Sequence, residues 1–192
     1  MSRTYGATMK WLVGFHISQW SVPGKPIGLS VTPSCNLLVT CRDEPNKLVE
    51  LSAGSGQCVR EIALQSDIVD PWHGVQLTPS RPKFVICHGW GDSLHRVCEV
   101  GDDGKVTRSY GGQRGSDVGQ LDSPCHLAVD KDSQFIFVTD QTNHRVVLLS
   151  PTLQFVHYIS EGLSLTHRLY LHQATRRLFV GQVGGGVTVN QL

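Results

Sequence analysis

The segment 124-PCHLAVDKDSQFIFVTDQTNHRVVLL-149 decides the fold expected for this chain of 192 residues. Two short runs in which apolar residues alternate with other residues, 127–129 and 135–138, follow its proline, and Asn143-His144-Arg145 opens a third run, 146–149. Such alternation, bounded by Asp, Asn and Ser, is typical of β-strands joined by turns. The segment therefore predicts one small antiparallel sheet.

The same pattern recurs along the chain. In three of four copies, 21 residues separate the proline, or its equivalent, from the residue that opens the third strand: Pro26 and Lys47, Pro124 and Arg145, Leu165 and Gly186. The second copy, from Pro71 to Arg96, spans 25 residues and so predicts a longer loop. A repeat of this kind, with several strands per unit and no helical period, predicts an all-β fold, a β-propeller of four-stranded blades.

We expect a single domain over residues 1–192, with units at about 20–66, 67–114, 115–161 and 162–192. The expected strands are 28–31, 37–40, 48–51, 59–63, 74–77, 84–87, 96–100, 106–110, 127–129, 135–138, 146–149, 156–159, 168–171, 178–182 and 187–189. Because the last unit has only three strands, residues 10–18 are predicted to complete its blade and join the termini. The alternative is a chain that forms part of a larger propeller.

Composition agrees with one soluble domain that has a real core, since 40% of the residues are hydrophobic. The formal net charge of +1 argues against a partner selected by bulk electrostatics. The apolar stretch 11–15 is too short for a signal-peptide core or a membrane span. We therefore expect a cytoplasmic protein without a membrane partner.

The six cysteines form no CxxC pair, so we expect free thiols and neither a zinc site nor another cofactor. They are Cys35, Cys41, Cys58, Cys87, Cys98 and Cys125. Three histidines, His73, His126 and His167, lie two residues after the proline or its equivalent, where the first unit has Gly28. First strands line the channel of a propeller, so these imidazoles either satisfy neighbouring backbone groups, which we favour, or converge on a metal ion.

The third unit resembles the NHL repeat. It carries the Gly-Gln lead, the proline, the Val-Asp strand end and the Asn-His-Arg of that family, at Gly119, Gln120, Pro124, Ala128, Val129, Asp130, Val138, Asp140, Asn143, His144 and Arg145, with His126 in place of the usual glycine. The second unit keeps Pro71, Gly74, Asp92, His95 and Arg96, the first keeps Pro26, Gly28 and Asn46, with Lys47 replacing arginine, and the fourth is eroded. The resemblance covers about residues 20–192, and NHL propellers commonly have six blades.

Within this motif, Asp140 and Arg145 are expected to pair across a hairpin and to act as scaffold residues. Asp92 and Arg96 are expected to repeat the pairing in the second unit. Pro124, Asn143 and His144 complete the structural set.

The resemblance implies a binding platform, since NHL domains often lie at the C-terminus of tripartite-motif ubiquitin ligases and bind a protein or a structured RNA. The sequence contains no RING-like series of cysteines and histidines, so any ligase role would belong to another domain or chain. RNA binding needs a basic face, whereas the basic residues here are scattered. Examples are Arg42, Lys47, Arg81, Arg108 and Arg114.

A peptide-amidating lyase is the enzymatic alternative, because its propeller carries zinc on histidines that directly follow the strand-leading proline. The residues at that place here are Ile27, Trp72, Cys125 and Thr166. A shift of one residue along a strand turns a side chain to the other face. We therefore expect no catalysis and no catalytic metal.

These observations predict a non-catalytic interaction scaffold, a monomer or part of a larger multidomain chain, that binds a protein partner through loops at one end of the ring. RNA is the alternative partner. Aromatic and arginine residues dominate contact hot spots, so the candidate surface comprises Trp72, His73, Trp90, Cys125, His126, His167 and Arg168. Packing of Trp72 between blades is the competing interpretation.

Overall fold

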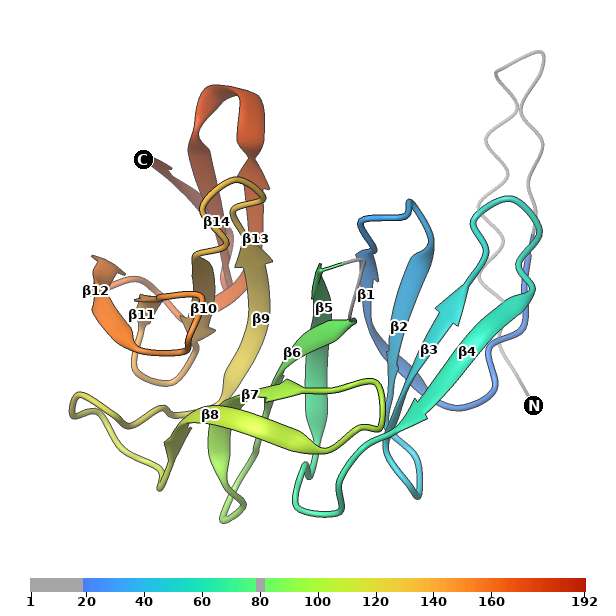
Figure 1. The fold of residues 1–192 in the computed structure, drawn as a ribbon. Coiled ribbons are helices and arrows are strands. Elements are labelled where there is room, and N and C mark those ends of the chain that lie inside the picture. Colours follow the sequence, from blue (N-terminus) through green and yellow to red (C-terminus); the bar gives the residue numbers. More distant parts are fainter. Residues whose placement is uncertain (1–18, 79–81) are drawn as a thin grey trace.

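Fifteen strands form the described part of this computed structural model, residues 19–78 and 82–192. They lie in four antiparallel sheets that follow one another in chain order, so the four-bladed, all-β propeller is confirmed (Figure 1). Each strand predicted from the alternation overlaps one strand of the structure. The prediction that residues 10–18 complete the last blade lies outside the described residues.

Each blade runs from an inner strand to an outer strand. Blade 1 consists of β1 (Pro26–Val31), β2 (Leu37–Cys41), β3 (Lys47–Leu51) and β4 (Cys58–Ala63). Blade 2 consists of β5 (Pro71–Thr78), β6 (Lys83–His88), β7 (His95–Val100) and β8 (Val106–Gly112). Blade 3 consists of β9 (Pro124–Val129), β10 (Ile136–Asp140), β11 (Arg145–Leu149) and β12 (Phe155–Ser160). Blade 4 consists of β13 (Thr166–His172), β14 (Arg177–Gln182) and β15 (Gly186–Gln191), with a 3-10 turn at Gln173–Thr175.

The core lies between blades, because each sheet is apolar on both of its faces. Leu48 of blade 1 packs in one buried cluster with Ile86 of blade 2, and Phe137 of blade 3 packs with Leu169 of blade 4. Burying one such side chain stabilises the fold by about 1.5–3 kcal/mol. The inner strands β1, β5, β9 and β13 contact one another in succession and line the centre of the arc in Figure 1.

The Asp140 and Arg145 pair forms as predicted, with Arg145 Nε 2.7 Å from Asp140 Oδ2 and both residues buried. The guanidinium also donates to the carbonyl oxygens of Ser116 (2.7 Å) and Gln120 (3.3 Å), while the Asp122 N–H donates to Asp140 Oδ1 (2.6 Å). The pair therefore ties the hairpin of blade 3 to the loop that leads into the blade.

The remaining residues of the motif shape the same corner. Asn143 Nδ2 donates to Asp140 Oδ2 and to the Gly115 carbonyl oxygen, each at 2.8 Å. His144 is exposed and adopts φ 56°, so it closes the turn through its backbone, and Pro124 starts β9. These contacts agree with a scaffold role for the motif.

The predicted pairing of Asp92 with Arg96 is wrong. Arg96 Nη2 lies 2.5 Å from Asp67 Oδ2, and its Nε donates to His88 Nε2 at 2.8 Å. His88 pairs with Arg96 across the hairpin, as Asp140 pairs with Arg145, so an imidazole takes the place of the carboxylate. Asp92 lies exposed in the long β6–β7 loop, which carries it away from the strand end.

The alignment of the fourth unit is also wrong by one residue. Thr166 pairs with Gln182 as Pro124 pairs with Asp140, and Arg168 pairs with Gly181 as His126 pairs with Thr139. Thr166 is therefore the proline equivalent rather than Leu165. The β14–β15 turn is one residue shorter than the β10–β11 turn, so counting back from Gly186 with a fixed spacing displaces the start of the unit.

The first and last blades expose apolar side chains that have buried counterparts inside the arc. Tyr170, Phe179 and Val189 form a row across blade 4, and Tyr170 is 61% exposed. The corresponding row of blade 3, which includes Phe137, is buried against blade 4. On blade 1, Leu29 is 60% exposed, whereas its counterpart Leu127 is buried against blade 2. None of the core clusters in the described residues joins blade 1 to blade 4.

Candidate functional site

Four residues occupy one structural position on the inner strands, which we call the channel position: Gly28, His73, His126 and Arg168. Each follows an irregularity at the start of its strand and pairs with the equivalent residue of the second strand. The structure thus brings His73, His126 and Arg168 together at the centre of the arc. His167 is one residue away from the channel position and is half-buried.

The two channel imidazoles stack, with ring centroids 3.9 Å apart and planes 15° from parallel. His73 Nδ1 accepts the Leu127 N–H (3.3 Å) and His126 Nδ1 accepts the Leu169 N–H (3.4 Å). Each ring must then carry its proton on Nε2, and that of His73 donates to the Leu29 carbonyl oxygen (3.1 Å). The histidines therefore satisfy backbone groups of neighbouring inner strands, which supports the favoured interpretation.

Burial lowers the pKa of His73 to about 4. Burial, followed by the nearby His73 and the positive charge of Arg168, lowers the pKa of His126 to about 2. Both rings are consequently neutral at physiological pH. Within residues 19–78 and 82–192, no group of three or more His, Cys, Asp or Glu side chains is arranged to hold a metal ion.

The channel position of blade 1 requires glycine. A Cβ on Gly28 would lie 2.5 Å from the Trp72 carbonyl oxygen and 3.1 Å from the His73 Cα, both backbone atoms. We expect Gly28→Ala to lower the free energy of unfolding by about 1–3 kcal/mol, because β1 and β5 must separate.

Urea denaturation of the purified chain checks this expectation. Gly54→Ala in the β3–β4 turn is the matched control, since its Cβ would meet no atom within 4 Å. Equal midpoints for the two variants would contradict the close approach of β1 and β5.

A second group of residues forms what we call the loop surface: Arg42, Val69, Trp72, Trp90 and Leu94. The rings of Trp72 and Trp90 lie 6.0 Å apart, and Trp90 is 55% exposed. The Arg42 guanidinium lies 4.6 Å from the centre of the Trp72 ring, and Arg42 Nε lies 3.5 Å from Asp70 Oδ1. Val69 and Leu94 are also exposed, so aromatic, apolar and cationic groups meet where the β4–β5 and β6–β7 loops end the blade.

The predicted surface thus divides into two parts that share Trp72. Trp72 also packs against the core between blades 2 and 3, as the competing interpretation holds. Cys125 belongs to neither part, because it is buried with its Sγ 3.2 Å from Thr139 Oγ1. Sequence reasoning missed Leu94 and Val69, although it had selected Trp90 in the same β6–β7 loop as Leu94.

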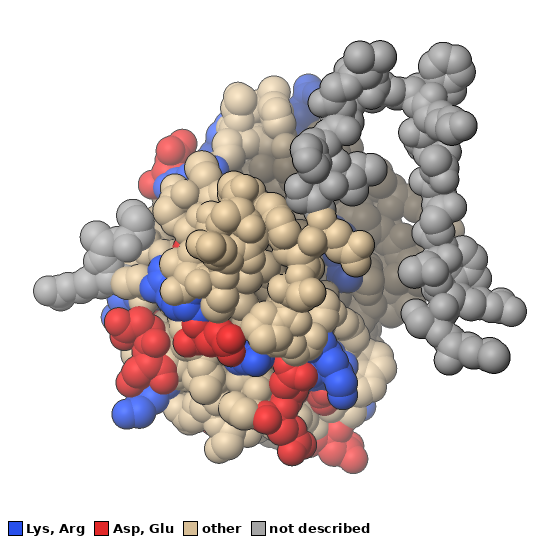
Figure 2. All heavy atoms as spheres, turned by 90° about the vertical axis from the view of Figure 1, so that its right-hand side faces the viewer, with Lys and Arg blue, Asp and Glu red and all other residues tan. Residues whose placement is uncertain are grey.

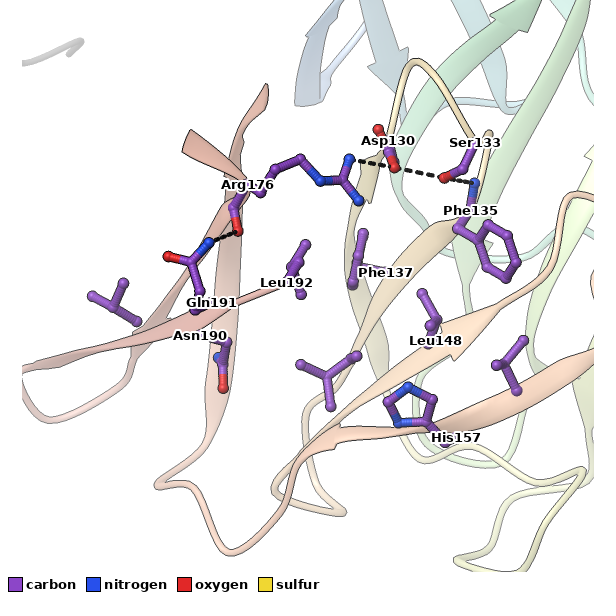
Figure 3. A pocket seen from close by; sticks show the side chains of 13 residues that line it. Asp130, Ser133, Phe135, Phe137, Leu148, His157, Arg176, Asn190, Gln191 and Leu192 are labelled. Atoms are coloured by element: carbon purple, nitrogen blue, oxygen red, sulfur yellow. Dashed lines mark hydrogen bonds and ion pairs between the residues drawn. The ribbon is translucent and has the colours of Figure 1, made fainter. Parts of the chain in front are cut away.

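A cavity of about 790 Å³ lies between blades 3 and 4 (Figure 3). Phe137 and Leu148 face it from blade 3, and Leu192 faces it from the end of blade 4, while Arg176 and Asp130 pair at its rim (2.6 Å). In the described residues, β15 has no neighbour on its outer side.

The position of this cavity follows from the repeat. In blade 3 the fourth strand, β12, places Phe155 and Tyr158 against the core between blades 2 and 3. Blade 4 has no fourth strand within the described residues, and the cavity lies beside its open edge. The assignment of residues 10–18 to that place stays a prediction.

No helix in the described part of the chain is long and apolar enough to span a membrane.

Comparison with known proteins gives no matching family model and no matching curated protein. Solved structures do match. A chain of a nidogen/laminin complex is 16% identical, with a TM-score of 0.66, over 87% of this chain and 65% of that one. A protein of unknown function from Bacteroides caccae is 15% identical, with a TM-score of 0.64, over 86% and 60%.

The β-propeller domain of Cps50 (Swd1) from Myceliophteria thermophila is 11% identical, with a TM-score of 0.61, over 85% of this chain and 51% of that one. The chain therefore spans between half and two thirds of the length of these structures. At such identities the likeness concerns the fold alone, and it shows that this chain is built as a β-propeller.

Proposed function

We propose that this protein is a non-catalytic interaction scaffold that binds a protein partner at the loop surface. The observation that carries the proposal is the pair Trp72 and Trp90, in which a half-buried indole anchors an exposed one. Rigid aromatic side chains contribute much contact area at small cost in conformational entropy, and they dominate binding hot spots. Arg42, stacked on Trp72, adds a cation that can pair with an acidic group of the partner.

The finer assignment is an NHL-type propeller of the kind found in tripartite-motif ligases. It is supported by the Asp140 and Arg145 pair and by its anchoring of the loop at Ser116 and Gln120. A cytoplasmic location is part of the proposal, and the six cysteines, all of them unpaired, agree with it.

A protein partner is favoured over RNA by the distribution of charge. On the side of the molecule shown in Figure 2, basic and acidic side chains lie next to one another instead of forming a basic face. Ion pairs such as Lys47 with Glu61 (3.1 Å) and Arg60 with Glu50 (2.6 Å) neutralise basic residues of blade 1. Phosphate recognition depends on unpaired basic groups.

The test is affinity capture with the wild-type chain and with Trp90→Ala. Because truncating a hot spot costs about 2 kcal/mol or more, partners that bind the loop surface should be recovered about 30-fold less efficiently by the variant. Quantitative mass spectrometry of lysates treated with nuclease measures the recovery.

Val59→Ala is the matched control, since Val59 is a similarly exposed apolar residue on the outer strand β4 of blade 1. Recovery that is equal for Trp90→Ala and the wild type would remove the loop surface from consideration. Recovery that disappears on nuclease treatment alone would point to RNA as the partner.

A further inference from the structure

We propose that the channel is a binding site for a carboxylate carried on a small apolar group. The proposal concerns the channel position and its cavity, and it does not rest on a protein partner at the loop surface. Four features carry it: an unpaired cation, an oriented N–H donor, the absence of acidic groups, and an apolar wall.

The cation is Arg168. It forms no ion pair with any described carboxylate, and its guanidinium donates to the neighbouring carbonyl oxygen of His167 (3.0 Å). Its charge nevertheless reaches the channel, because it contributes to lowering the pKa of both His73 and His126. An arginine held beside two neutral imidazoles leaves one positive charge that an anion can balance.

The donor is the Nε2–H group of His126, and a hydrogen bond to the backbone fixes it. Because His126 Nδ1 accepts the Leu169 N–H, its Nε2 carries the proton, and this N–H has no hydrogen-bond partner in the described part of the chain. Stacking on His73, which is itself tied to the Leu29 carbonyl oxygen, holds the His126 ring in place.

The cavity at this point has a volume of about 250 Å³. Its lining consists of Ile27, Gly28, Leu29, Trp72, His73, His126 and Arg168, and so contains no acidic side chain. The unpaired His126 N–H and one guanidinium select an anion, because carboxylate oxygens only accept hydrogen bonds. Ile27, Leu29 and Trp72 form the part of the wall that suits an apolar body.

A single carboxylate fits the charge of the site better than a phosphate does. With both imidazoles neutral, Arg168 supplies one positive charge, which one carboxylate balances. A phosphate group, which carries nearly two negative charges at pH 7, would bring an uncompensated charge into the cavity.

Benzoate is a suitable probe, and benzamide is its neutral counterpart of the same shape. Titration calorimetry of the full chain at constant ionic strength should show binding of benzoate and at least about 10-fold weaker binding of benzamide, because a charge-assisted hydrogen bond is worth about 1.5–3 kcal/mol. Arg168→Gln should weaken benzoate binding by about 10-fold to 100-fold. Arg177→Gln, an exposed arginine on the same blade, should leave it unchanged.

The pKa of His126, measured by nuclear magnetic resonance, is a readout that a purely structural role of Arg168 would not change when benzoate is added. Bound benzoate should raise the pKa of His126, because an anion offsets the positive charge of Arg168. Since Arg168 is exposed, Arg168→Gln should keep the thermal midpoint of the wild type, so lost binding would not reflect unfolding.

A second arm identifies the source of the carboxylate. The capped peptide acetyl-Gly-Glu-Gly-amide is compared with its Gln counterpart. Binding of the Glu peptide, without binding of the Gln peptide, would assign the site to an acidic side chain of a polypeptide. Binding of benzoate alone would assign it to a free small acid. Absence of binding by both, equal binding of benzoate and benzamide, or binding that survives Arg168→Gln would overturn the proposal.

Discussion

Lowering the pH from 7 to about 5 is expected to destabilise this propeller strongly, because three histidines are held neutral inside it. Burial lowers the pKa of His73 and of His88 to about 4 and that of His126 to about 2, whereas the same side chains titrate near pH 6.5 in the unfolded chain. Between these values the unfolded state binds more protons than the folded state, so the free energy of unfolding falls as the pH falls.

The expected magnitude is large. Each proton contributes about 1.4 kcal/mol per pH unit, so three histidines contribute about 4 kcal/mol per pH unit between about pH 6 and pH 5. Asp67 and Asp130, whose pKa values are lowered, add to the loss nearer pH 4, while burial raises the pKa of Asp140 and opposes it. A domain of ordinary stability, about 5–15 kcal/mol, should then unfold before pH 4.

Urea titrations at pH 7, 6, 5 and 4.5 measure this slope. His126→Gln should reduce it by about one third. Gly54→Ala, whose Cβ would meet no atom within 4 Å, should leave it unchanged. A free energy of unfolding that stays constant from pH 7 to pH 5 would contradict the buried, neutral state of the three rings.

Asp140→Ala is the substitution expected to cost the most stability. It removes the carboxylate that accepts from Arg145, Asn143 and the Asp122 N–H, and it leaves the Arg145 guanidinium buried without its counter-ion. Breaking a buried pair in this way typically costs about 3–5 kcal/mol. Chemical denaturation of the variant at pH 7 measures the loss.

Two comparisons separate this effect from a general loss of charge. Glu61→Ala breaks the more exposed pair with Lys47 and should change the stability little. Asp140→Ala combined with Arg145→Ala should cost less than the sum of the single substitutions, because no buried charge is left unpaired. A loss for Asp140→Ala that does not exceed that for Glu61→Ala would show that the pair is not a determinant of the fold.

The sequence predicted the fold well, because the signals that define a propeller are local. Short apolar runs mark the strands and turn residues mark the hairpins, so the strands of each unit can be recognised without reference to the rest of the chain. The pairing of Asp140 with Arg145 was predictable for the same reason, since five residues and one hairpin separate them.

The interactions that the sequence did not reveal depend on loop length and on contacts between blades. Arg96 of blade 2 binds Asp67, which lies in the β4–β5 loop that leads into blade 2. The two residues are too far apart in the sequence for a short spacing to reveal the pair. Arg168 replaced His167 at the channel position because one turn of blade 4 is a residue shorter, a difference that the apolar pattern does not record. The stacking of His73 on His126 joins two blades, so it became visible only in three dimensions.

The apolar rows at the two ends of the arc differ in kind, and this difference gives the molecule a direction. The exposed row of blade 4 corresponds to the row of blade 3 that packs against the following blade. The exposed Leu29 of blade 1 corresponds to Leu127 of blade 3, which packs against the preceding blade. A sheet added at either end would make a heterologous contact, in which the row of one end packs on the different row of the other end. Two copies could therefore not use these rows to form a dimer with twofold symmetry. Repeated addition would close only into a circle or grow without limit, and the curvature of the blades would decide which of the two occurs.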